Sequence, residues 1–62
     1  MGPTKVSHAA FRQMVHFERL RLAFMSKITD ESVPEAAAIE ASVRDKLHAD
    51  GMVIEPAQGA DK

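Results

Sequence analysis

Apolar residues between positions 7 and 28 recur at the three- and four-residue spacing of an α-helix. This segment contains neither glycine nor proline, and it is rich in Ala, Leu, Met, Arg and Phe, of which Ala, Leu, Met and Arg are strong helix formers. Ser7 stands where a side-chain oxygen can accept a hydrogen bond from a free backbone N–H group of the first turn. The pattern therefore predicts a first helix over residues 7–28.

The apolar positions of this first helix form two stripes rather than one. At about 100° per residue, the longer stripe is centred on Phe17, and we assign it to the core of the fold. Its members are Met14, Phe17, Leu20, Phe24 and Ile28. The second stripe lies roughly 80–160° further around the helix. It consists of Phe11, Val15, Leu22 and Met25.

Capping residues mark both ends of a second helix. Ser32 followed three positions later by Glu35 has the spacing of a capping box, and Pro34 suits a first turn. Gly51 suits the position just after a helix, where a left-handed backbone is common. We predict a second helix over residues 33–50. Its narrow apolar stripe, assigned to the core, consists of Ile39, Val43 and Leu47.

Two helices with a short connection predict an antiparallel helical hairpin and an all-α fold class. The hairpin domain spans residues 7–54. Residues 1–6 are expected to be a flexible lead-in, and residues 55–62 a disordered polar tail. The apolar run Met52-Val53-Ile54 either covers the open end of the core or forms a brief strand.

The second helix can cover one face of the first helix but not both. The surplus face, made by the second stripe, is expected to be a partner interface, because contiguous exposed apolar patches mark such sites. Its residues are Phe11, Val15, Leu22 and Met25. We expect a homodimer, in which two hairpins form a four-helix bundle. The alternatives are a bent first helix, a cover supplied by residues 52–54, or docking on an unrelated protein.

Charge is unevenly divided along the chain, although the net charge is only −1. The first half is basic and the second half is acidic, so the two halves attract each other when they pack. The basic side of the first helix is a candidate contact for nucleic acid. Its residues are Arg12, Arg19, Arg21 and Lys27. The alternative interpretation is a solvated face, or one paired with the acidic second helix.

No catalytic, metal-binding or cofactor motif is apparent. The chain has no cysteine, and its three histidines, His8, His16 and His48, lack the i, i+4 spacing of helical metal ligands. We therefore expect no enzymatic activity, no metal and no cofactor. No apolar run approaches the roughly 20 residues of a membrane span, and a cytoplasmic location is expected.

Residues 43–55, VRDKLHADGMVIE, resemble the end of a winged-helix recognition helix and its first wing strand. That resemblance implies a DNA-binding domain. However, no second wing strand follows Pro56, and no turn divides residues 33–50 into two helices. The overall layout is also similar to the small dimeric helical hairpins of the Rop type, which bind RNA; this likeness is architectural and transfers no residue.

Taken together, these patterns predict a small non-enzymatic interaction module, either an adaptor or a regulatory subunit. It would act through self-association and an apolar surface of the first helix. A small dimeric nucleic-acid-binding regulator is the alternative.

Overall fold

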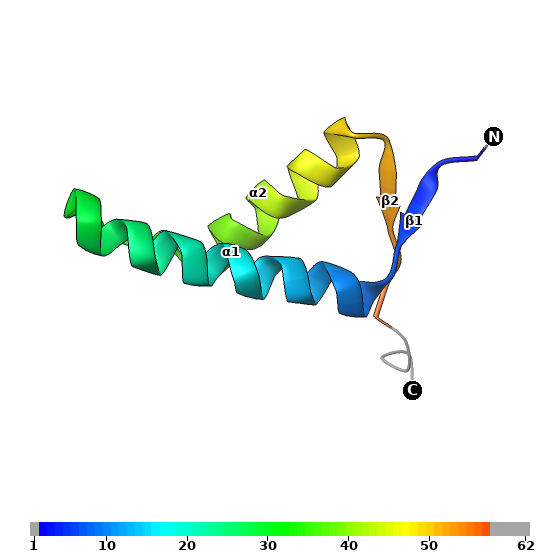
Figure 1. The fold of residues 1–62 in the computed structure, drawn as a ribbon. Helices are drawn as coiled ribbons and strands as arrows, with labels where there is room; N and C mark the ends of the chain where they lie inside the picture. The colour runs from blue at the N-terminus through cyan, green and yellow to red at the C-terminus, as the bar shows by residue number, and fades with distance from the viewer. Residues whose placement is uncertain (1, 58–62) are drawn as a thin grey trace.

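The computed structural model describes residues 2–57 as two helices joined to a small parallel sheet. The element order is β1 (Thr4–Val6), α1 (His8–Thr29), α2 (Ala36–Ala49) and β2 (Met52–Ile54). Figure 1 shows α2 lying at an angle to α1, with both strands beyond the N-terminal end of α1. The chain is therefore mostly helical and hairpin-like, but the sheet departs from the all-α class expected from the sequence.

Capping explains both ends of α1. The Ser7 side chain accepts a hydrogen bond of 3.1 Å from the backbone N–H of Ala10, as the sequence predicts. At the other end Asp30 adopts a left-handed backbone with φ of 61°, and its N–H donates to the Ser26 carbonyl. Aspartate tolerates this conformation better than most residues, so the helix ends where the chain turns.

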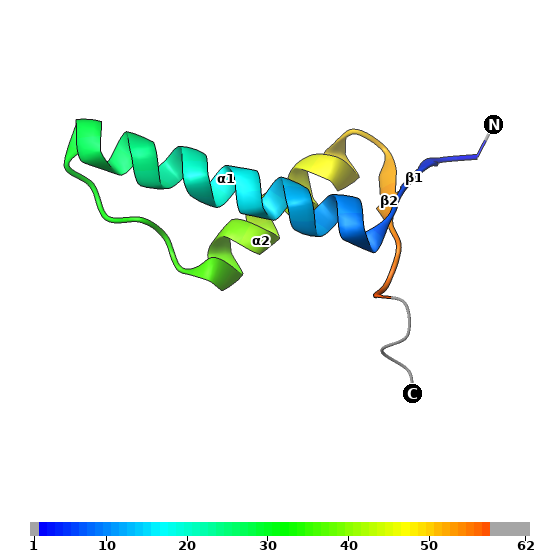
Figure 2. The ribbon, with the colours of Figure 1, turned by 60° about the horizontal axis from the view of Figure 1, so that its bottom comes forward.

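The capping box predicted for α2 does not form. The helix begins at Ala36 with Glu35 at the N-cap, and no side chain caps it there. Residues 31–35 instead run as an extended connection, which Figure 2 shows passing alongside the C-terminal half of α1. A proline disfavours helical backbone at the residue before it. Pro34 therefore keeps Val33 out of the helix, and α2 begins later than predicted. Gly51 closes α2 as expected, with φ of 81°.

The two ends of the chain meet in the sheet. Thr4, Lys5 and Val6 pair in parallel with Met52, Val53 and Ile54 respectively. The pairing continues one step further, because the Glu55 N–H donates to the Val6 carbonyl at 2.8 Å. The segment expected to be a flexible lead-in thus contains β1, and Glu55 is held by the sheet. Residues 58–62 of the predicted tail lie outside the described residues.

The core lies between the N-terminal half of α1, the inner face of α2 and the sheet. Six apolar side chains are buried there, and Phe11 is the most enclosed, at 1% exposure. Leu22, Met52 and Ile54 are partly buried against them. The six are Val6, Phe11, Val15, Ile39, Val43 and Leu47.

The core contradicts the predicted use of the two stripes of α1. Phe11 and Val15, expected at a partner interface, are buried, whereas the stripe expected in the core is exposed. Leu22 packs on the core, while Met25 remains 39% exposed. The reason is that Val6 lies in β1, and the sheet and α2 together cover the side of α1 that carries Phe11 and Val15.

The molecule is flat and open for its size. The Cα atoms extend over 42 × 31 × 14 Å, and the radius of gyration is 13.6 Å, against roughly 10.6 Å for a compact domain of this length. The accessible surface is 4938 Å², whereas a typical monomer of this mass exposes only about 3950 Å². Domains usually bury their helices between packed layers, and here one face of α1 has no layer over it.

Candidate functional site

The most distinctive surface is an apolar stripe on α1, which we call the exposed stripe. It lies about 140° around the helix from the buried side chains of α1. Phe17 is 59% exposed, Phe24 66% and Ile28 64%. Its members are Met14, Phe17, Leu20, Phe24 and Ile28. Contiguous exposure of such large side chains is typical of an interaction surface.

An ion pair borders the exposed stripe on one flank. Arg21 donates two hydrogen bonds to the Glu18 carboxylate, at 2.6 and 3.1 Å. Lys46 of α2 lies 4.0 Å from the same carboxylate. The hydrogen bond from Arg21 lowers the pKa of Glu18, although partial desolvation opposes the effect, and the same contact raises the pKa of Arg21. The pair thus neutralises a cation at the edge of an apolar surface.

The four basic residues proposed for nucleic-acid contact do not form one free patch. Arg21 is held by Glu18, and Arg12 lies 3.8 Å from Glu40 of α2. Arg19 and Lys27 make no salt bridge within residues 2–57. Part of the basic side therefore pairs with the acidic second helix, as one of the two sequence interpretations held.

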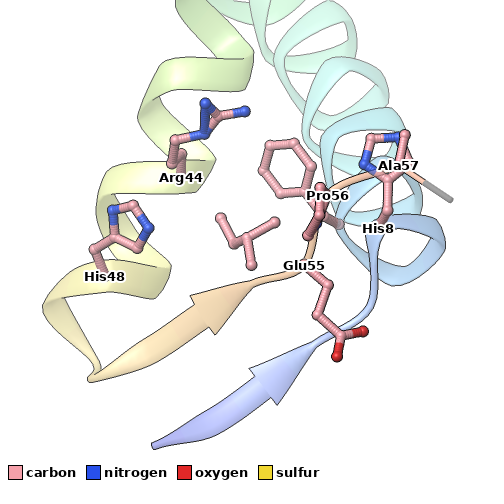
Figure 3. A pocket seen from close by; sticks show the side chains of 8 residues that line it. His8, Arg44, His48, Glu55, Pro56 and Ala57 are labelled. Atoms are coloured by element: carbon pink, nitrogen blue, oxygen red, sulfur yellow. The ribbon is translucent and has the colours of Figure 1, made fainter. Parts of the chain in front are cut away.

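A shallow hollow of about 360 Å³ lies where α1, α2 and the end of β2 meet. Figure 3 shows Arg44 and His48 on α2 at one side, with His8 and Pro56 at the other. The Arg44 guanidinium lies 5.1 Å from the centroid of the Phe11 ring and donates to Glu40 at 3.1 Å. A cation is attracted to the face of an aromatic ring, so Arg44 stabilises the packing of α2 against Phe11 of α1.

Residues 2–57 were also compared with the requirements of a metal site and of a membrane-spanning helix. Across residues 2–57, no three His, Asp or Glu side chains gather closely enough to hold a metal ion. No helix within that range has the length and apolar character needed to cross a membrane.

The helical periodicity of the sequence predicts the right elements for the core but exchanges the roles of the two stripes of α1. Ile39, Val43 and Leu47, assigned to the core, are buried, and so is Phe11, assigned to the interface. The sequence holds only a weak signal for this, the β-branched residues Thr4 and Val6 just before the Ser7 cap, which favour a strand over a helix. Comparison with protein-family models, curated proteins and solved structures gives no match, so the functional argument rests on this chain's own residues.

Proposed function

We propose that this protein is a non-enzymatic interaction module that self-associates through the exposed stripe of α1. The observation that carries the proposal is the exposure of Phe17, Leu20 and Phe24 in one row on a regular helix. Burying a large apolar side chain fully contributes on the order of 1.5–3 kcal/mol. A second copy of the chain would supply the missing cover.

The size of the open surface supports a partner of comparable size. The accessible surface of the chain exceeds that of a compact monomer of the same mass by about 1000 Å². This is close to the roughly 800 Å² that each partner buries in a standard interface. A chain of 62 residues without cysteine also lacks the disulfides that commonly stabilise small domains. Dimerisation would add a packed layer over the exposed stripe of a molecule whose Cα atoms span 14 Å in their shortest direction.

This proposal moves the partner interface to the other side of α1. Phe11 and Val15 cannot serve it, because the chain's own core encloses them. Met25 remains a contributor at the edge, being 39% exposed. The regulatory or adaptor role would then depend on the dimer and on the surfaces that the dimer leaves exposed to other molecules.

The test compares two substitutions that add the same charge at neighbouring positions of α1. Phe24→Asp falls on the exposed stripe, whereas Ala23→Asp falls on a polar side of the same helix. Light scattering after size exclusion should show a dimer for Ala23→Asp and a monomer for Phe24→Asp. Equal masses for both variants would overturn the proposal.

A nucleic-acid-binding regulator is the second candidate, favoured by the unpaired state of Arg19 and Lys27 within the described range. Phosphate contacts of this kind weaken steeply with salt. Binding of a labelled duplex at 20–50 mM salt, roughly the range where such contacts are strongest, should fall in an Arg19→Ala, Lys27→Ala variant. Undetectable binding by the wild-type protein at that salt would exclude this candidate.

A further inference from the structure

The exposed stripe reads almost the same in both directions along α1. Met14 and Ile28 lie at its ends, Phe17 and Phe24 lie inside them, and its midpoint falls between Leu20 and Arg21. A second copy laid antiparallel about that midpoint sets Phe17 opposite Phe24 of the partner subunit. Aromatic pairs of this kind contribute beyond the area they bury.

The shape of the molecule also distinguishes parallel from antiparallel pairing of two α1 helices. The sheet and α2 widen the N-terminal end of α1, whereas the C-terminal end is flanked only by the connection to α2 (Figures 1 and 2). Pairing about residues 20 and 21 brings residues 12–29 of the two helices alongside each other. The sheet of each copy then lies beyond the overlap, whereas a parallel pair would place both sheets at the same end.

The ion pair on the flank of the stripe fits the antiparallel direction as well. A two-fold axis perpendicular to both helices keeps each flank on the same side of the interface, so the two Glu18–Arg21 pairs meet. At a rise of about 1.5 Å per residue, each Arg21 falls at a height between its own Glu18 and that of the partner subunit. Along the helix direction the two Arg21 side chains therefore lie between the two Glu18 side chains, and the four charges sum to zero, which permits them at an interface rim.

The geometry points to an antiparallel two-fold dimer of α1 helices in which Met14 faces Ile28 of the partner subunit. This inference rests on the self-association proposed above and specifies its arrangement. The four helices then form an open arc rather than a square bundle, because about 140° separates the covered and exposed sides of α1, where a square bundle needs a right angle. Both α2 helices lie on one side of the arc.

Single cysteines test the arrangement cleanly, because the natural chain has none. Met14→Cys and Ile28→Cys keep both phenylalanines of the stripe. A mixture of the two variants should form a mixed disulfide dimer under mild oxidation, whereas each variant alone should not. In the antiparallel pair two copies of either position lie roughly 20 Å apart, far beyond the reach of a disulfide. Leu20→Cys, beside the two-fold axis, should cross-link to itself.

The outcomes separate the arrangement from the self-association beneath it. Ready cross-linking of Ile28→Cys alone, in a protein that sediments as a dimer, would overturn the antiparallel arrangement and leave the dimer standing. A dimer in which neither the mixture nor Leu20→Cys cross-links would also overturn it. A monomeric wild-type chain would remove the proposed function itself.

Discussion

The two apolar sides of α1 are alike in composition but differ in what covers them. Phe11, on one side, is packed by α2 and the sheet and is 1% exposed, whereas Phe24, on the other, is 66% exposed. Each stripe fits a helical period, so periodicity alone cannot choose between them. The choice depends on where the chain ends meet, because the β1–β2 pairing fixes the direction from which Val6, Met52 and Ile54 cover the helix.

Removing one aromatic ring from each side should give the largest contrast. Phe11→Ala should lower the free energy of unfolding by about 3–5 kcal/mol, enough to abolish folding in a chain this small, and circular dichroism should show the helix loss at every concentration. Phe24→Ala should keep the fold, and its destabilisation should grow with protein concentration, because dimer stabilisation follows mass action. A concentration-independent loss of similar size at both positions would contradict the account.

The second largest contrast should be between the two serines that precede the helices, measured as the loss of unfolding free energy when each is replaced by alanine. Ser7 caps α1 through its side chain, whereas Ser32, proposed from the sequence to cap α2, precedes an extended connection. Ser7→Ala should cost about 1 kcal/mol, and Ser32→Ala should stay within about 0.5 kcal/mol of the wild type. Urea denaturation measures both, and a larger loss for Ser32→Ala would mean that the capping box forms in solution.

Gly51 should be less tolerant of alanine than its open surroundings indicate. A Cβ atom at this position meets nothing within 4 Å, but φ is 81°. Gly51→Ala should therefore cost about 1 kcal/mol through backbone strain alone. The matched change Gly2→Ala, also in open space and without a positive φ, should be neutral in the same urea experiment.

The smallest effect should come from the Glu18–Arg21 pair. Because folding lowers the pKa of Glu18, the pair stabilises the fold above the unfolded glutamate value of about 4.3 and loses that contribution as pH falls through the lowered value. Glu18→Gln should cost a few tenths of a kcal/mol at pH 7 and nothing once Glu18 is protonated. A loss that persists unchanged at the lowest pH would indicate a packing role instead.

Local signals in the sequence located both helices, but they misplaced the start of α2 and did not reveal the sheet. Ser7 and Gly51 act through their immediate neighbours, so their roles in ending helices could be predicted within a residue or two. The pairing of Val6 with Ile54 joins positions 48 residues apart, and three-residue strands carry little pattern of their own. Missing that contact reversed the two sides of α1, and with them the predicted interface.

Sedimentation equilibrium of the wild-type chain over a range of micromolar concentrations tests the central claim most directly. The account predicts a mass that rises to twice the 6.8 kDa of one chain and stops there, since a closed two-fold interface admits one partner only. A well-folded chain that stays at 6.8 kDa throughout that range would contradict it.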